Sequence, residues 1–149
     1  MDLFLGTYNY NIDDKKRLRL PPKFKELLGK DVVITAIDNS ELSLVSADKF
    51  NDQVNRMLSS HSNSNQKQRS IIKFITSRSV ELKVDASGRI LIPEEMINFS
   101  SISKEVVVLG WGDRVGITSK EKYDINNGNL ETEKTMKEGI ESFEELFMM

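Results

Sequence analysis

Hydrophobic and polar residues alternate in two stretches of the chain, and each stretch is followed by the same series of features. The positions that share the apolar face are Tyr8, Tyr10 and Ile12 in the first stretch and Val80, Leu82 and Val84 in the second. Alternation with a period of two is typical of a half-buried strand. A charged turn, a second short apolar strand (residues 18–20 and 90–92) and a proline follow each time. We therefore predict a strand–turn–strand unit at both places.

Each unit continues with a short helix and two more strands. Proline is favoured in the first turn of a helix, where its missing N–H is not needed. Phe24, Leu27 and Leu28 give the first helix an apolar face, and Gly29 ends it. Apolar runs then predict the closing strands, at residues 32–36 and 41–45 in the first unit and at 106–109 and 114–118 in the second.

The two stretches are copies of one unit. Asp-Asp-Lys-Lys-Arg at residues 13–17 aligns with Asp-Ala-Ser-Gly-Arg at residues 85–89, and Pro21 aligns with Pro93, always 72 positions apart. Units of roughly 50 residues bury too little apolar surface to fold alone. We therefore expect an α+β, mostly β fold in which the copies share one core as a pseudo-dimer. The expected parts are a first repeat (3–50), a helical connector (51–76), a second repeat (77–123) and an acidic helical tail (124–149).

The connector and the tail both show helical periodicity. Residues 47–58 and 66–75 are expected to be helical, separated by a polar loop in which the single histidine, His61, is expected to be solvent-exposed. The tail carries an apolar stripe with acidic residues around it. We expect this stripe to pack on its own subunit or on a neighbouring one; docking to another protein is the alternative. The stripe consists of Met136, Ile140, Phe143 and Phe147.

Composition excludes several functional classes. The chain has 149 residues, 38% of them hydrophobic and 30% charged, with no cysteine and one histidine. Disulfide scaffolds, thiolate metal sites and cysteine nucleophiles are excluded, and a glycine-rich phosphate loop or a nucleophile–base pair is not found in the sequence. We expect a cytoplasmic protein that is not an enzyme, with no cofactor, no metal, no small-molecule substrate and no membrane association.

Charge is distributed unevenly along the chain. Residues 15–25 contain six cations and no acid, whereas residues 121–149 contain eight acids and three lysines, a net charge of −5. Since the whole chain has a net charge of −2, the first 120 residues carry +3. A basic segment of this density indicates either contact with nucleic acid or a solvated surface loop.

The repeated aspartate and arginine have separate expected roles. A carboxylate facing phosphate would be repelled, so Asp13 and Asp85 are interpreted as structural partners that hold the turns. Arg17 lies among Lys15, Lys16 and Arg19, which favours contact with DNA. For Arg89, structural and DNA-binding roles are equally supported.

The tryptophan has a simpler interpretation. Trp111 sits at the end of a predicted strand, between Gly110 and Gly112. Packing in the core or in an interface is expected there rather than stacking on a nucleic-acid base.

The paired motifs and their flanks resemble the MraZ family of bacterial regulators, which is associated with division and cell-wall gene clusters. The supporting segments are residues 4–8 (Phe-Leu-Gly-Thr-Tyr), 104–110 and 112–115, and the resemblance covers residues 3–125. It implies two tandem AbrB/SpoVT-like swapped-hairpin half-barrels, assembled into closed homo-oligomeric rings. It also implies that the motif turns lie together and contact short G-rich direct repeats, commonly to repress transcription. One departure concerns Lys16, where the family usually has the glycine that the second copy keeps as Gly88.

Three functions are consistent with these features of the sequence. The leading hypothesis is a nucleoid-associated, sequence-specific regulator that binds double-stranded DNA, in which Arg17 reads a base while Lys15, Lys16 and Arg19 hold phosphates. The alternatives are a sequence-tolerant architectural DNA-binding protein and a ring-forming interaction scaffold. For Lys16, the two possibilities are a strained positive φ or an adjusted turn that presents one more cation.

Overall fold

The two copies contain the same elements in the same order. The computed structural model describes residues 2–60, 65–127 and 130–147, so His61 lies outside the described residues. In the first copy these are β1 (Thr7–Asn11), β2 (Arg17–Arg19), α1 (Pro22–Leu28), β3 (Asp31–Asp38) and β4 (Glu41–Ser46). In the second they are β5 (Ser79–Lys83), β6 (Arg89–Leu91), α4 (Glu94–Ser100), β7 (Glu105–Gly110) and β8 (Val115–Ser119). The predicted α+β order within each repeat is thus confirmed.

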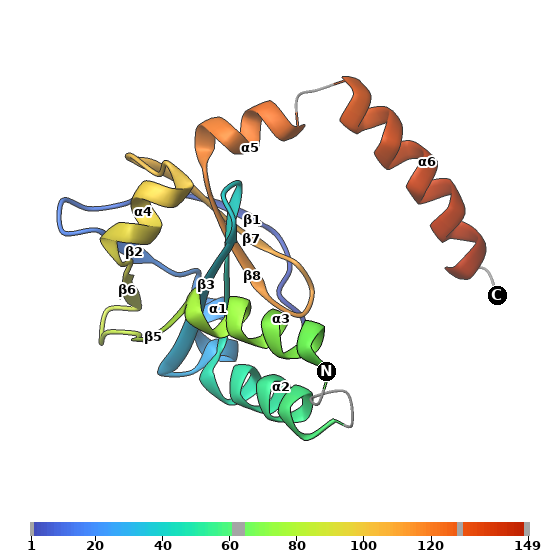
Figure 1. Cartoon of the computed structure of the whole chain (residues 1–149). Helices are drawn as coiled ribbons and strands as arrows, with labels where there is room; N and C mark the ends of the chain where they lie inside the picture. The colour runs from blue at the N-terminus through green and yellow to red at the C-terminus, as the bar shows by residue number, and fades with distance from the viewer. Residues whose placement is uncertain (1, 61–64, 128–129, 148–149) are drawn as a thin grey trace.

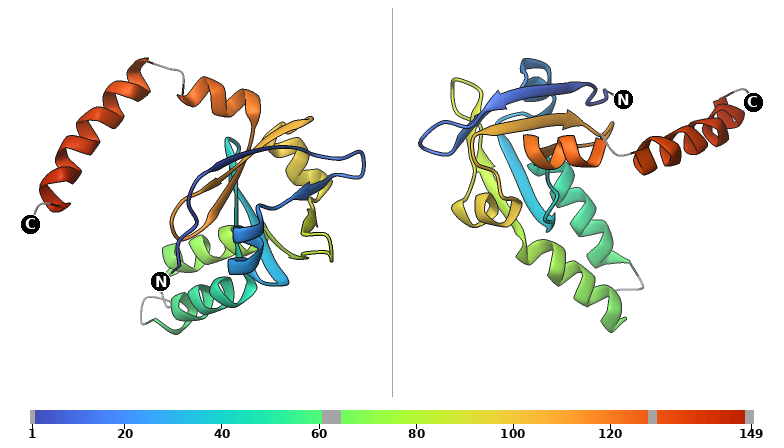
Figure 2. Two further views of the ribbon diagram at one scale, coloured as in Figure 1. Left: turned by 180° about the vertical axis from the view of Figure 1, so that it is seen from behind. Right: turned by 90° about the horizontal axis from the view of Figure 1, so that it is seen from above.

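The remaining helices join the copies or follow them. The connector forms a pair of helices, α2 (Ala47–Ser59) and α3 (Gln66–Ser77), which contact each other and lie side by side in Figures 1 and 2. The chain ends with α5 (Lys120–Asn127) and α6 (Leu130–Phe147). Within the part of the chain that the structure describes, no helix has the length and hydropathy needed to cross a membrane.

Strands are exchanged between the copies. The main sheet is antiparallel with the order β1-β7-β8-β4-β3-β5, so the first strand of each copy pairs with the third strand of the other. β2 and β6 form a separate antiparallel pair in which Leu18 lies opposite Ile90. The order is symmetric about the β8–β4 pair, which makes the chain an internal pseudo-dimer. The expectation of one shared core is confirmed.

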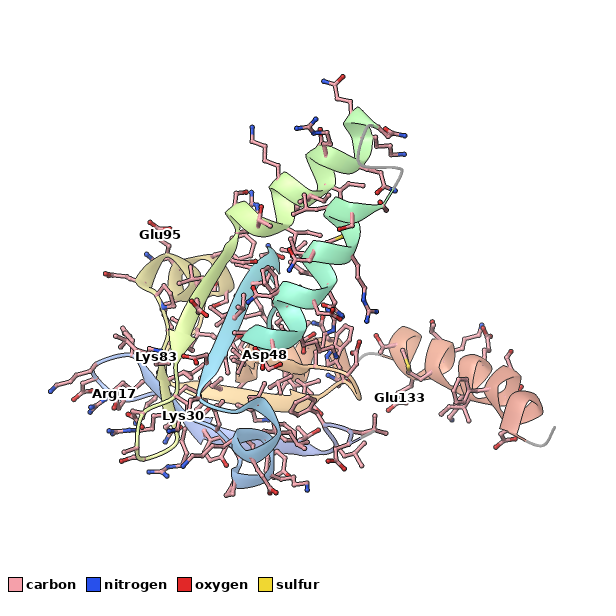
Figure 3. All side chains as sticks on the ribbon, turned by 90° about the horizontal axis from the view of Figure 1, so that it is seen from below. Arg17, Lys30, Asp48, Lys83, Glu95 and Glu133 are labelled. Carbon is pink, nitrogen blue, oxygen red and sulfur yellow. The ribbon has the colours of Figure 1, made fainter. Side chains whose placement is uncertain are left out.

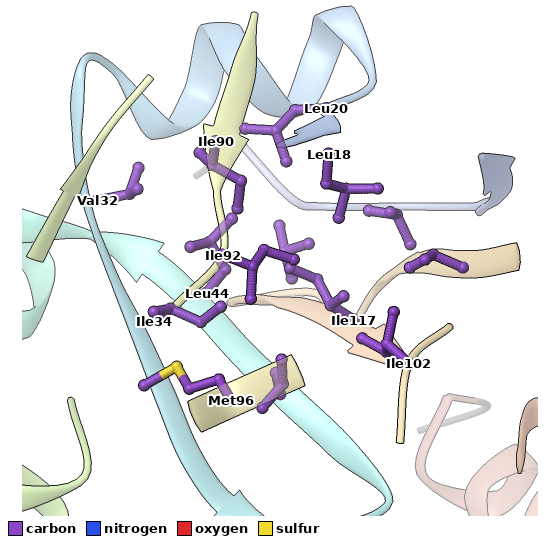
Figure 4. Close-up of a cluster of buried hydrophobic side chains, with 14 of the residues drawn as sticks. Leu18, Leu20, Val32, Ile34, Leu44, Ile90, Ile92, Met96, Ile102 and Ile117 are labelled. Atoms are coloured by element: carbon purple, nitrogen blue, oxygen red, sulfur yellow. The ribbon is translucent and has the colours of Figure 1, made fainter. Parts of the chain in front are cut away.

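The core lies between one face of the main sheet and a layer made of α1, α4 and the β2–β6 pair (Figure 4). Leu18, Ile34, Ile90 and Ile117 are fully buried in it. Phe24 of α1 meets the rings of Phe4 and Tyr8 edge-on, at centroid distances of 5.3 and 5.4 Å. Both copies contribute side chains, so neither repeat has a core of its own.

The predicted end of α1 is also found. Pro21 precedes the helix, Pro22 occupies its first turn, and Gly29 ends it with φ +80°. This conformation is inexpensive only for glycine, which explains why the helix stops there.

Two predictions about apolar side chains are tested in part by the single chain. Trp111 is 58% exposed, and its indole N–H donates to Glu41 Oε1 at 3.0 Å, so it does not belong to the core of this chain. Its packing in an interface stays a prediction. In the tail stripe, Met136 and Ile140 are each 57% exposed, and α6 stands away from the sheet in both views of Figure 2. Packing of the stripe on a neighbouring subunit stays a prediction. The side chain of Phe147 lies outside the described residues.

Candidate nucleic-acid interface

The first motif folds into a turn organised by one carboxylate. Asp13 Oδ1 accepts hydrogen bonds from the backbone N–H groups of Lys15 and Arg17, both at 2.9 Å. Its Oδ2 accepts from Arg17 Nε at 2.7 Å. The backbone N–H of Arg17 is the main reason that the pKa of Asp13 lies below its ordinary value, and the guanidinium acts in the same direction. The aspartate is therefore charged at neutral pH and fixes both the backbone and the arginine.

The second motif repeats this geometry. Asp85 Oδ1 accepts from the backbone N–H groups of Ser87 and Arg89, both at 2.9 Å, and Oδ2 accepts from Arg89 Nε at 3.0 Å. The pKa of Asp85 is lowered, first by the backbone N–H of Arg89. The turn requires the arginine four positions after the aspartate, with three residues between them, which is why the spacing recurs.

Lys16 adopts the glycine conformation. Its φ is +64°, and that of Gly88 at the equivalent place is +81°. The N–H of each donates to the carbonyl of the motif aspartate at 3.0 Å. The first turn is therefore not adjusted to fit lysine; it keeps the shape of the second turn and carries an extra cation in a strained backbone conformation.

The two turns lie next to each other. The β2–β6 pair continues into them, because the N–H of Leu20 donates to the carbonyl of Gly88 and the N–H of Ile92 to that of Lys16. Arg19 Nη1 donates to the carbonyl of Ser87 at 3.2 Å. Two backbone hydrogen bonds and the Arg19 side chain thus hold both motifs together at one end of the molecule. Figure 3 shows Arg17 of this end on the side away from α6.

The cations at this end differ in exposure. Lys15 and Arg19 are exposed, whereas Lys16, Arg17 and Arg89 are half-buried. The side chain of Arg17 binds Asp13 through its Nε. Among the described residues, its two terminal nitrogens make no hydrogen bond or ion pair. In Arg89 the Nε is bound by Asp85 in the same way. Both arginines are therefore held through Nε, the guanidinium nitrogen nearest the aliphatic part of the side chain.

Two further lysines, which were not predicted to belong to this surface, lie beside it. Lys25 of α1 lies over the second turn, with its Cδ 3.2 Å from where a Cβ on Gly88 would stand. Lys25 and Lys30 line a groove of 720 Å³ that also includes Asp85 and Ala86. Lys25 belongs to the basic run, but only the strand exchange brings it beside the other copy's turn. Figure 3 shows Lys30 on the same side as Arg17.

Comparison with known proteins agrees with this architecture. The family model of the MraZ protein matches the chain twice, at residues 3–74 and 75–138. The chain belongs to the MraZ family. Proteins named transcriptional regulator MraZ are similar over most of its length: the one from Mycoplasmoides gallisepticum is 31% identical over 93% of this chain and 98% of its own.

Other MraZ relatives show the same degree of similarity. The transcriptional regulator MraZ of Mesoplasma florum is 33% identical over 93% of this chain and 95% of its own. The transcriptional regulator MraZ of Dictyoglomus thermophilum is 34% identical over 82% of this chain and 83% of its own. The family resemblance inferred from the paired motifs is therefore confirmed, and the two matches correspond to the two structural copies.

The motif surface offers charge and hydrogen-bond donors rather than catalytic groups. Among the described residues, no three histidine or acidic side chains are grouped so as to hold a metal ion. The two motif carboxylates already accept several hydrogen bonds each, and their lowered pKa values make them poor proton donors. The arrangement is suited to binding an anion with the arginines and lysines around them.

Proposed function

We propose that this protein regulates transcription by binding double-stranded DNA in a sequence-specific way through its two motif turns. The observation that carries the proposal is that Arg17 and Arg89 both approach Asp13, at 2.7 and 3.9 Å, while each is fixed by the aspartate of its own motif within a group of lysines. The names of its MraZ relatives agree with regulation of transcription. Since binding is the proposed activity, no catalytic group is required.

The aspartates prepare the arginines for base recognition. A guanine presents two acceptors, O6 and N7, in the major groove, and an arginine reads them with two N–H groups. Asp13 binds Nε of Arg17, so the terminal nitrogens stay available for such a pair. An arginine already held in place loses less conformational freedom on binding. The carboxylate thus supports binding without touching DNA.

The lysines supply affinity without sequence preference. Lys15 and Lys16 lie on the turn itself, and Arg19 lies on the adjoining strand. Charges of this kind neutralise phosphates and position the protein on the duplex. We assign Arg17 and Arg89 to base contact and Lys15, Lys16 and Arg19 to phosphate contact.

We further propose, in keeping with the family resemblance, a closed homo-oligomeric ring that binds short G-rich direct repeats upstream of the division and cell-wall genes and represses them. One pair of turns covers few base pairs and would bind weakly at physiological salt. A ring that engages several repeats raises affinity through effective concentration. Deleting one repeat should then reduce binding by more than its proportional share.

The test is a fluorescence-anisotropy titration with the DNA upstream of the protein's own gene, against a scrambled duplex of equal composition, at two salt concentrations. We expect preference for the native duplex that persists at higher salt. Arg17→Ala should lose about tenfold or more on the native duplex and much less on the scrambled one. Lys15→Ala is the matched control, because it should weaken binding to both duplexes alike.

Other outcomes would redirect the assignment. Equal, salt-sensitive binding to both duplexes would favour an architectural DNA-binding protein. Absence of binding to either would leave the scaffold hypothesis, in which the Asp–Arg pairs serve only to hold the two copies together.

A further inference from the structure

The second face of the main sheet is only partly covered. Along β3, Val33, Thr35 and Ile37 share this face because side chains alternate. Val33 and Val45 are buried against Ala47 and Phe50 of α2, but Ile37 is 47% exposed. The cover provided by α2 therefore ends before the strand does.

An apolar groove lies where this cover ends. It has a volume of 440 Å³ between the sheet and the α2–α3 pair. Its apolar lining comes from Ile37, Val45, Phe50, Val54, Met57 and Ile75. Arg56 and Arg114 also line it, and no acidic residue does. Arg56 pairs with Asp52 and Arg114 with Asp113, both on the exposed surface.

The last helix has the complementary composition. α6 contains six glutamates and two lysines, a net charge of −4, around the exposed Met136 and Ile140. By contrast α3, beside the groove, contains Lys67, Arg69 and Lys73 and no acid. An acidic helix with one apolar face matches the apolar groove in hydropathy and the basic helix α3 beside the groove in charge.

We propose that the groove receives α6 of a second copy of this chain. In the structure α6 contacts α5, and both views of Figure 2 show it projecting away from α2 and α3 of its own chain, which border the groove. A single contact between subunits would then cover both exposed apolar surfaces, the stripe of α6 and the groove. The helix therefore acts as an arm between subunits. This inference rests on the assembly part of the proposed function and is independent of DNA binding.

Cross-linking tests the contact directly, because the chain contains no cysteine. Ile37→Cys and Ile140→Cys are placed in separate chains that carry tags of different size and are co-expressed, purified and oxidised. We expect a disulfide-linked dimer with one chain of each type. Ser142→Cys is the matched control: it is exposed on α6, and two residues along a helix place it nearly on the opposite side from Ile140.

The outcomes separate the possibilities. Equal yields from Ile140→Cys and Ser142→Cys would overturn the proposal. So would a bridge that forms only when both cysteines are in one chain, because α6 would then occupy its own groove. Absence of the mixed dimer would likewise overturn it.

Molar mass from analytical ultracentrifugation separates this inference from the ring. We expect wild-type chains to be oligomeric, Ile140→Asp to shift toward smaller species and Ser142→Asp, with the same added charge, to leave the mass unchanged. A monomeric wild type would overturn the proposed ring. If the wild type is oligomeric and Ile140→Asp has the same molar mass as the wild type, only the α6 contact would be overturned.

Discussion

Asp13 Oδ2 lies 3.9 Å from Nη1 of Arg89, so the carboxylate of the first motif faces the arginine of the second. The same oxygen binds Arg17 at 2.7 Å. Asp85 contacts the arginine of its own motif. The two motifs are equivalent in sequence spacing, but the first aspartate lies between both arginines and organises the joint surface.

Asp13→Asn should therefore affect DNA binding more than Asp85→Asn. The amide keeps the backbone hydrogen bonds of the turn but loses the charge that holds Arg17 and faces Arg89. We expect a loss of several-fold to about tenfold in affinity for the native duplex, within the range for one arginine–guanine pair. Equal effects of the two substitutions in the same titration would contradict this asymmetry.

The motif aspartates should make the fold sensitive to acid. Both have a lowered pKa in the folded protein, so folding is favoured by their ionisation above the ordinary aspartate value of about 3.9. Their contribution is fully present above that pH and is lost as the pH falls through the lower folded-state pKa. We expect the free energy of unfolding, measured with urea between pH 6 and pH 3, to decrease below about pH 4.

The double variant Asp13→Asn, Asp85→Asn provides the control for this pH dependence. Its unfolding free energy should be lower at neutral pH and should change less between pH 4 and pH 3. An unchanged slope in the double variant would assign acid sensitivity to other carboxylates.

Lys16→Gly should separate charge from backbone strain. Glycine removes the strain of φ +64° but gives the unfolded chain more freedom, and each effect is of order 1 kcal/mol. The unfolding free energy should therefore change by less than about 1 kcal/mol. The slope of log affinity against log salt should fall in magnitude by about one, as expected for one lost phosphate contact. An unchanged salt slope would remove Lys16 from the DNA surface.

Leu18→Ala should destabilise the fold and separate the turns. Leu18 is fully buried opposite Ile90, and removal of a leucine side chain from a core costs about 2–5 kcal/mol. Leu91→Ala is the matched control on the paired strand, because Leu91 is 56% exposed and should change stability by less than about 0.5 kcal/mol. Urea denaturation of both variants compares them, and similar losses would contradict the described packing.

Removal of α6 should not alter binding to a single repeat. Figure 3 places Glu133 of α6 and Arg17 on different sides of the molecule. Ending the chain after residue 126 should leave the affinity for a one-repeat duplex unchanged and weaken binding to several repeats. A several-fold gain for the one-repeat duplex would instead indicate that the acidic tail competes with DNA.

The sequence predicted those features that depend on local patterns. Alternation located the strands, Pro21 and Gly29 bounded α1, and the spacing from Asp13 to Arg17 indicated a repeated turn. Positions determined by distant partners were not predictable in this way. Lys25 reaches the second turn only because the copies exchange strands.

Two exposed apolar features show the same limit. Hydropathy suggested that Trp111 and the α6 stripe are covered, but it does not say by what. Trp111 is exposed and donates its indole N–H to Glu41, and α6 extends away from the sheet of its own chain (Figure 1). A pattern within one segment predicts that a face is apolar, whereas its cover depends on the rest of the assembly.

The strand exchange has a consequence for synthesis on the ribosome. Thr7 at the start of β1 pairs with Leu109 in β7, and the opposite edge strand, β5, pairs with β3. The ribosome releases β1 long before its partner exists, so the sheet cannot close until nearly the whole second copy has emerged. Contacts so distant along the chain are formed slowly. The first repeat must remain incomplete during translation, and a nascent chain stalled between the repeats would expose the edge of β3 that β5 later covers.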